Sequence, residues 1–395
     1  MRVTKPLEAV IPIIIGFSVN GWNVYRSLRK IGVAPLALDT DPSSVFWSTR
    51  GVRLHYAPSV HGPALIEALH GAVKPEEKYV VISATEEAVL ALSELRGQLP
   101  ANVRLLFPEQ ETVAMLLDKR LFYERVVSMG QTISPMHFME DWNEIPTAAS
   151  IRFPCILKGR TKLYIPDIAK AYRLESMSEL RATVDTISRV AGARPCDFVI
   201  QEWVPGTDAD VVFCLQYYDA ASNPKISFVG RKIRQWRPEV GGTASAAPLD
   251  DREALQQTTE FFRSVKMRGI CSMEFKRSPA DGKLYMIEPT ACRADYQEGV
   301  AIANGYNVPL VAYQDCTGRS NGQVHRAARP VTWVHMGDDF AAASHYVSRG
   351  ELTWWQWARS LRGPKAYAIY AREDPGPFVE LMRRKMANRL RRLYS

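Results

Sequence analysis

The stretch Gly269-Ile-Cys-Ser-Met-Glu-Phe-Lys-Arg-Ser-Pro-Ala-Asp-Gly-Lys-Leu-Tyr-Met-Ile-Glu-Pro-Thr-Ala-Cys-Arg293 contains two runs of strand-forming residues, 270–277 and 284–290. Between them, residues 278–283 include Pro, Asp and Gly, which favour turns. This pattern predicts a β-hairpin, and the remaining segments can be arranged around it.

The predicted hairpin carries two carboxylates. If it folds about Asp281, Glu274 lies directly opposite Glu288, and because side chains alternate along a strand, both carboxylates point to one face. Their β-carbons would be roughly 5 Å apart, where like charges repel unless a cation lies between them. Magnesium is the first candidate, since one or two protein carboxylates usually bind it together with phosphate oxygens and water. The alternative is an edge hairpin on which one glutamate simply points to solvent.

The composition is that of a soluble globular protein, with 46% hydrophobic and 23% charged residues among 395. A chain of this length is expected to form two or three domains. No apolar run of about 18 residues occurs, so no membrane-spanning helix is predicted. The short apolar run at 9–15 contains a proline and leads into a glycine-bearing loop instead of a cleavage site, so we interpret it as a buried strand.

Cysteine and histidine spacing favours neither disulfides nor zinc. The six cysteines include no Cys-x-x-Cys pair, which indicates small buried side chains in a reducing cytoplasm. The seven histidines are scattered, so zinc is not expected. The net charge of +8 favours anionic partners, and much of it lies in the last twenty residues.

Residues 1–110 alternate between strand and helix patterns. Strands are expected at 9–15, 33–38, 79–83 and 103–107, with helices at 23–31 and 85–95. This alternation predicts an N-terminal domain built on an open parallel α/β sheet. The loop Gly16–Gly21 lacks the Gly-x-Gly-x-x-Gly motif of dinucleotide sites, although such sheets bind ligands at the carboxyl ends of their strands.

Residues 111–318 have a mixed α and β pattern. A helix begins near Glu111, and a strand from 151 leads Lys158 to a glycine turn. Further on, helices are expected at 176–191 and 251–266, and strands at 198–204, 211–218 and 225–233. The last two strands are expected to pair antiparallel and to precede the hairpin.

Residues 319–395 form a C-terminal extension that ends in a basic helix at 378–395. Apolar side chains recur there at helical spacing among arginines and lysines, namely Phe378, Met382, Met386, Leu390 and Leu393. Such a helix can lie on an anionic membrane surface or on nucleic acid. The alternative is a solvated terminal helix that packs on its own protein.

The order of basic and acidic residues resembles that of the ATP-grasp superfamily, in particular its carboxylate–amine ligases related to carbamoyl phosphate synthetase and D-aspartate ligase. The resemblance runs from about Ile11 to about Gly318 and rests on two lysines, a strand end, basic strand residues and the hairpin carboxylates. It implies an α/β and α+β ATP-grasp fold: an open parallel α/β domain at 1–110, an ATP-grasp domain at 111–318 with a small lid at about 130–205, and a C-terminal helical extension at 319–395.

The resemblance also implies a site for ATP and Mg²⁺, with Mn²⁺ as an alternative ion. Lys119 and Lys158 would bind the phosphate and adenine sides of the nucleotide, and one of Asp208 and Asp210 the ribose. The adenine edge would be held by unpaired backbone groups at a strand end, formed by Glu202, Trp203 and Val204. The metal would be bound by Glu274, Glu288 and Thr290.

Two departures from the family pattern concern the metal and the lid. Thr290 stands where family members usually have Asn, and Arg293 comes one position late, which puts a second magnesium ion in doubt. The loop Gly159-Arg-Thr-Lys-Leu-Tyr164 lacks the usual Gly and Ser residues, so lid closure would depend on the Arg160 and Lys162 side chains.

For the substrate, alternation places Lys232 and Arg234 on one strand face, and backbone N–H groups of the following Gly241-Gly242-Thr243 loop can approach an anion. With Arg293, these basic residues would hold the substrate carboxylate and its acyl phosphate. Asp295 and Gln297, just past the carboxylates, would contact the acyl phosphate or orient the amine.

The resemblance thus implies a cytoplasmic ligase that joins a small carboxylate and an amine through an acyl phosphate, releasing ADP and phosphate. Two alternatives stay open: an ATP-binding sensor or scaffold that has lost turnover, and an adaptor whose basic tail is the primary feature. The tail predicts contact with the inner face of an anionic membrane rather than with nucleic acid. A homodimer is also compatible with the sequence.

Overall fold

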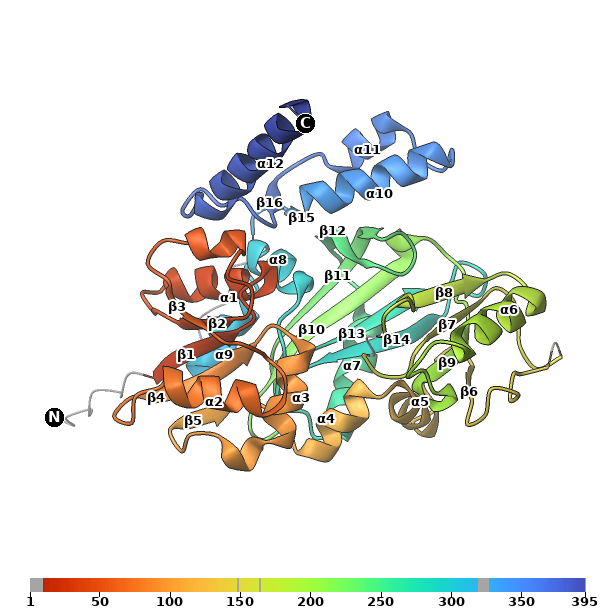
Figure 1. Cartoon of the computed structure of the whole chain (residues 1–395), viewed down its shortest axis with the longest axis horizontal. Helices are drawn as coiled ribbons and strands as arrows, with labels where there is room; N and C mark the ends of the chain where they lie inside the picture. The colour runs from red at the N-terminus through yellow and green to blue at the C-terminus, as the bar shows by residue number, and fades with distance from the viewer. Residues whose placement is uncertain (1–9, 148, 163–164, 319–326, 395) are drawn as a thin grey trace.

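The computed structural model describes residues 10–147, 149–162, 165–318 and 327–394, without the side chains of 392–394. Three sheets organise these residues (Figure 1). Four short 3₁₀ helices connect the larger elements: η1 (Val45–Ser48), η2 (Arg96–Gln98), η3 (Pro195–Asp197) and η4 (Asp208–Asp210). No helix among the described residues is both long and apolar enough to cross a membrane.

The N-terminal sheet is parallel throughout, as predicted. Its strand order is β3-β2-β1-β4-β5, formed by β1 (Val10–Ile15), β2 (Leu36–Asp39), β3 (Arg53–Tyr56), β4 (Lys78–Ser83) and β5 (Val103–Leu105). Ile13, Ile14 and Ile15 are fully buried, because this sheet is covered on both faces by α1 (Val19–Arg29), α2 (Gly62–Ala72) and α3 (Glu86–Glu94). The sequence analysis missed β3 and α2, since the edge strand Arg-Leu-His-Tyr has little apolar character.

A small antiparallel sheet has the strand order β6-β9-β7-β8 and lies within residues 130–205, for which a lid stays a prediction. It consists of β6 (Met136–Phe138), β7 (Cys155–Gly159), β8 (Ala171–Leu174) and β9 (Phe198–Glu202), and α6 (Met177–Ser188) covers it. Helices α4 (Gln110–Leu117) and α5 (Lys119–Ser128) precede it in the chain. Leu157, Leu180 and Ile200 belong to a separate small core, which explains how this sheet can stand apart from the others in Figure 1.

The third sheet has seven strands in the order β14-β13-β10-β11-β12-β15-β16. Its first five strands are β10 (Val211–Tyr218), β11 (Pro224–Trp236), β12 (Gly242–Pro248), β13 (Gly269–Arg277) and β14 (Leu284–Ala291), accompanied by α7 (Arg252–Ser264), α8 (Tyr296–Ala303) and α9 (Val308–Cys316). The hairpin β13–β14 has the predicted register, with Glu274 opposite Glu288.

The C-terminal extension contributes strands as well as helices. It comprises β15 (Thr332–Val334), α10 (Met336–Ser348), α11 (Trp354–Ser360), β16 (Lys365–Tyr367) and α12 (Gly376–Tyr394). Strand β15 pairs with β12, and β16 pairs with β15, so the extension completes the large sheet. The predicted helical extension with its terminal helix is confirmed, and the structure adds the pairing of two short strands with the large sheet.

Candidate functional site

Glu274 and Glu288 face each other across the β13–β14 hairpin, and Glu274 is held in place by two donors. Lys232 Nζ lies 2.8 Å from Glu274 Oε1, and Gln297 Nε2 donates to the same oxygen at 2.7 Å. Burial raises the pKa of Glu274; the charge of Lys232 opposes this shift, and the charge of Glu288 adds to it. Of the two carboxylates, Glu274 is therefore the one that protonates more readily.

Glu288 lies in a strongly positive field. Burial alone would raise its pKa, but the charges of nearby lysines outweigh burial and bring the pKa to about 2; these are Lys119, Lys158, Lys170 and Lys232. Lys170 was not found by the sequence analysis, because it stands in an exposed segment with no pattern to single it out. Four cations near two carboxylates leave an excess of positive charge that a polyanion would balance.

Lys158, on β7, has an unusually low pKa of about 8. Burial is the largest cause, and the neighbouring charges of Lys119 and Lys170 lower the pKa further, while Glu288 raises it. A lysine that is crowded by like charges and shielded from water is stabilised by an incoming anion.

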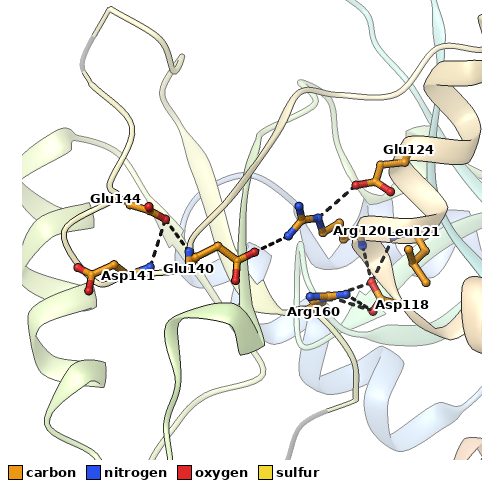
Figure 2. A network of polar contacts seen from close by, with 8 residues as sticks. All are labelled: Asp118, Arg120, Leu121, Glu124, Glu140, Asp141, Glu144 and Arg160. Atoms are coloured by element: carbon orange, nitrogen blue, oxygen red, sulfur yellow. Dashed lines mark hydrogen bonds and ion pairs between the residues drawn. The ribbon is translucent and has the colours of Figure 1, made fainter.

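A polar network joins the start of α5, which carries Lys119, to the residue after β7, the strand that carries Lys158; Figure 2 shows the side chains of Asp118 and Arg160 at its centre. Asp118 caps α5 by accepting hydrogen bonds from the Arg120 and Leu121 amides at 2.8 and 3.2 Å. Arg160, which follows β7, donates from Nε to both Asp118 carboxylate oxygens at 2.9 and 2.8 Å. Its carbonyl accepts from the Lys119 amide at 3.0 Å. The start of α5 and the end of β7 are thus fixed side by side.

The two basic residues predicted to close the lid are both engaged in ion pairs. Arg160 is held by Asp118, and Lys162 Nζ lies 2.6 Å from Glu87 on the first turn of α3. The neighbouring Glu86 lies 3.8 Å from Arg293. The loop after β7 and the end of β14 therefore both contact the N-terminal domain at the same turn.

At the strand end predicted to bind adenine, only some of the backbone N–H and C=O groups lack hydrogen-bond partners among the described residues. The prediction that Glu202 leaves its backbone unpaired is wrong, because its amide donates to Pro135 O at 3.0 Å and its carbonyl accepts from Ser134 Oγ at 2.7 Å. Trp203 also donates its amide, to Pro154 O, whereas no backbone hydrogen bond of Val204 occurs among the described residues.

The Trp203 ring has cations near it. Arg173 Cζ and Lys276 Nζ lie 4.9 and 4.6 Å from the ring centroid. Neither cation was singled out from the sequence, since a cation–π contact joins residues far apart in the chain.

Asp208 and Asp210 differ in the number of hydrogen bonds that their carboxylates accept. The buried Asp208 accepts hydrogen bonds from the Gln235 amide, Gln235 Nε2, the Glu239 amide and Tyr346 Oη, at 2.9, 2.9, 3.2 and 2.7 Å. These bonds occupy both carboxylate oxygens. Among the described residues, Asp210 accepts hydrogen bonds from the Thr207 amide and hydroxyl alone, within a capping box, so it is the freer candidate for a ribose contact.

Lys232 and Arg234 are both buried on one face of β11, as alternation predicted. Their partners differ: Lys232 lies against Glu274, whereas Arg234 forms a buried ion pair with Asp339 on α10 at 2.7 Å and donates to Ser360 at 2.8 Å. The prediction that Arg234 receives a substrate carboxylate is wrong on this geometry, because Asp339 already neutralises it.

The predicted anion-binding loop at 241–243 is mostly a strand. Gly242 and Thr243 begin β12 and pair with Trp236 and Gln235, and Thr243 is buried. Gly241 lies against the backbone of Trp236 and Arg237, where an added Cβ would approach Arg237 N to 1.9 Å. The prediction of an open loop at residues 241–243 is wrong. The two glycines instead allow the backbone at the start of β12 to approach the end of β11 closely.

The segment after β14 turns sharply before Arg293. Cys292 adopts φ +58°, a left-handed conformation that is uncommon for a non-glycine residue and marks a local turn. The additional residue that places Arg293 one position later than in the family pattern lies in this part of the chain. Asp295 then caps α8 by accepting from the Gln297 amide at 2.8 Å, which brings the Gln297 side chain to Glu274.

The residues present suit a magnesium ion. Thr290 follows Glu288 by two positions on β14, so its hydroxyl lies on the same strand face. Within the described ranges, no group of three or more His, Cys, Asp and Glu side chains could hold a metal ion. Two carboxylates alone are sufficient only for an ion that takes its other ligands from phosphate and water, which is typical of Mg²⁺.

Comparisons with known proteins agree on the architecture. Neither a protein-family model nor a curated protein sequence matches the chain. Among solved structures, the chain is similar to the ADP complex of PurK, an N5-carboxyaminoimidazole ribonucleotide synthetase (TM-score 0.64, 16% identity, covering 87% of this chain and 86% of that one). The corresponding synthetase from Staphylococcus aureus, also with ADP, gives a TM-score of 0.66 at 15% identity, with 87% of each chain covered.

An L-amino acid ligase from Bacillus licheniformis is a third similar structure, with a TM-score of 0.59 at 13% identity over 83% of this chain and 79% of that one. At such identities the similarity concerns the fold. The strand orders, the hairpin register and these structural neighbours together show that the chain has the ATP-grasp fold.

Proposed function

We propose that this protein is an ATP-dependent carboxylate–amine ligase that activates a small carboxylate as an acyl phosphate and transfers the acyl group to an amine, releasing ADP and phosphate. The observation that carries the proposal is the cluster of four lysines around Glu288, opposite Glu274. The ADP bound in similar structures and the ligase among them support this assignment.

In this proposal the lysines bind the phosphates. ATP carries about four negative charges, and positioning together with charge neutralisation supplies most of the catalysis of phosphoryl transfer. Lys119 and Lys158 would contact the phosphate chain, with Lys170 as a third cation. Val204 and Asp210 would contact the adenine and ribose.

Glu274, Glu288 and Thr290 would hold Mg²⁺ or Mn²⁺, which supplies further neutralisation of phosphate charge when bound. Gln297 keeps Glu274 oriented from α8, and Lys232 balances its charge. Arg293, at the left-handed turn after β14, would hold the acyl phosphate for attack, and Asp295 would orient the amine.

Thermal unfolding with ATP, with and without Mg²⁺, tests the nucleotide site. A ligand at 100 times its Kd stabilises the native state by about 2.7 kcal/mol, so the wild type should melt at a higher temperature with MgATP. Glu288→Gln should lose most of this increase, and Glu67→Gln, at an exposed position on α2, should keep it. An unchanged melting temperature in the wild type would contradict the proposal.

The second candidate function is an ATP-binding sensor without turnover, which Thr290 in place of the usual Asn favours. Magnesium-dependent stabilisation by ATP, combined with no ADP release across panels of acids and amines, would support it over the ligase. A cytoplasmic location and a homodimer stay predictions. Contact with a membrane surface is a separate proposal that depends on the C-terminal extension.

A further inference from the structure

Helix α12 has an inner and an outer side. In Figure 1, α12 lies beside the N-terminal domain; its inner side contacts η1, and Arg384 donates a hydrogen bond to the carbonyl of the nearby Ser43. Leu381 and Ala387 are half-buried there. The helix is therefore attached to the N-terminal domain, as expected of a terminal helix that packs on its own protein.

The outer side of α12 is apolar and exposed. Val379, Met386 and Leu390 are 58%, 66% and 53% exposed, and at about 100° per residue these three fall in one narrow stripe, with Phe378 on its flank. Leu393, predicted to continue this stripe, lies outside the residues whose side chains are described. A helix that packs only on its own protein would bury such a stripe rather than turn it outward.

Charge is concentrated around this stripe. Residues 349–395 contain eleven lysines and arginines against four acidic residues, which accounts for +7 of the net charge of +8. Arg383, Lys385 and Arg389 are exposed on α12 beside the apolar residues. The rest of the chain is close to neutral overall, so most of the net positive charge lies in this extension.

Helix α11 adds aromatic side chains with cations next to them. Trp354 and Trp355 are 45% and 60% exposed, and the guanidinium carbons of Arg359 and Arg362 lie 5.3 and 5.7 Å from the Trp355 ring centroid. Figure 1 places α11 and α12 at the same end of the molecule, at the top of the view. Tryptophan and basic residues together are typical of protein surfaces at the membrane interface.

We propose that the C-terminal extension binds an anionic lipid surface, with the apolar stripe of α12 in the headgroup region and its basic residues on the lipid phosphates. Trp354 and Trp355 form a second point of contact. The net charge of +7 on residues 349–395 favours an anionic lipid surface, because a neutral one has no net charge to attract it. This surface is separate from the lysine cluster, and its existence does not depend on the enzymatic proposal.

Co-sedimentation of the full-length protein with vesicles tests the inference. We expect binding to vesicles of phosphatidylcholine with 30% phosphatidylglycerol and at least tenfold weaker binding to pure phosphatidylcholine. Two variants add the same negative charge at exposed positions on different sides of α12, Met386→Glu on the stripe and Asn388→Glu away from it. The charge alone should weaken binding about fivefold in both, and Met386→Glu should lose about a further tenfold because a carboxylate resists transfer into the interface.

Equal losses in the two variants would overturn insertion of the stripe, and no binding to anionic vesicles would overturn the inference entirely. If sedimentation velocity instead shows a dimer that Met386→Glu dissociates, the stripe is an interface between two copies and the lipid assignment is wrong. Thermal stabilisation by MgATP is measured in parallel, so a failure of lipid binding remains distinguishable from a failure of the proposed function.

Discussion

The charge of Lys158 is expected to depend on whether an anion occupies the proposed site. Its pKa of about 8 is set by burial first and then by Lys119, so the folded protein binds fewer protons there than the unfolded chain does between pH 8 and 10.5. The contribution of Lys158 to stability consequently rises with pH across this window, as the unfavourable buried charge is lost.

Binding of a phosphate should reverse that shift. We expect MgATP binding at pH 8.5 to take up a proton at Lys158, and the affinity to fall as the pH rises above about 8. Calorimetry in two buffers of different ionisation enthalpy measures the uptake. Lys158→Arg, which stays charged, should bind without it; proton uptake that persists in this variant would assign it to another group.

Glu298 on α8 is a buried carboxyl without a role in the proposed chemistry. It is 0% exposed, neither carboxylate oxygen has a hydrogen-bond partner among the described residues, and burial, with Asp295 adding, raises its pKa well above the usual value. A carboxyl in such surroundings is held protonated, and it stabilises the fold below pH 4.5 and progressively less as the pH rises.

Glu298→Gln removes this pH dependence while keeping the shape. We expect similar free energies of unfolding for wild type and variant at pH 4.5, and a variant more stable by at least about 1.4 kcal/mol, the equivalent of one pKa unit, at pH 8.5. Urea unfolding at the two pH values measures both. A difference that does not change with pH would mean that Glu298 is ionised in the folded protein.

At the scale of elements, the ion pair between Arg234 on β11 and Asp339 on α10 fastens the C-terminal extension to the large sheet. Asp339 is 0% exposed and also accepts from Ser245 on β12 and from Trp357 on α11, the latter at 2.8 Å. Four elements thus share one carboxylate.

Asp339→Asn should destabilise the protein by about 3–5 kcal/mol, because it leaves the Arg234 charge buried without a partner. Replacing both residues by apolar ones of similar size, Arg234→Met with Asp339→Leu, should recover much of the loss. Denaturant unfolding provides the comparison. If the double variant is less stable than Asp339→Asn, the extension depends on the hydrogen bonds of the pair rather than on charge balance.

Tyr346 connects α10 to Glu274, in the proposed nucleotide site, through a chain of hydrogen bonds. Its hydroxyl donates to Asp208, which accepts from Gln235 Nε2; Gln235 Oε1 accepts from Lys232 Nζ at 2.9 Å, and Lys232 in turn lies against Glu274. Side chains that form such a chain fix one another's positions.

Tyr346→Phe should cost about 1–2 kcal/mol of unfolding free energy and should also weaken MgATP binding, although Tyr346 lies beyond the carboxylates. Tyr370→Phe, at an exposed position of the same extension, is the matched control and should change neither quantity. A loss of stability with unchanged MgATP affinity would limit Tyr346 to a structural role.

At the scale of the whole molecule, the proposed nucleotide site and the apolar stripe of α12 should function independently. Deletion of residues 378–395 removes most of α12, whose main contact among the described elements is with η1. We expect the truncated protein to lose vesicle binding and to keep its MgATP-dependent rise in melting temperature. Loss of both would show that α12 supports the ATP site through the N-terminal domain.

Local patterns were sufficient for the hairpin register and the parallel N-terminal sheet, because turn residues and alternation act over a few positions. They could not reveal contacts across the chain. Asp339, which forms the ion pair with Arg234, lies 105 positions further along the chain. Tyr346, whose hydroxyl donates to Asp208, lies 138 positions further along. Gly242 and Thr243 were misassigned for the same reason: their strand exists only because β11 pairs with it.

The strand order of the large sheet also has a consequence during synthesis. In the part of the chain that the structure describes, the outer edge of β12 pairs with β15, which follows it in the chain by some 80 residues. At roughly 5–20 residues per second, the ribosome leaves that edge without its neighbour for about 4–16 s. An uncovered strand edge is a template for pairing with another chain, so nascent copies on one polysome are exposed to mutual aggregation until residue 334 has emerged.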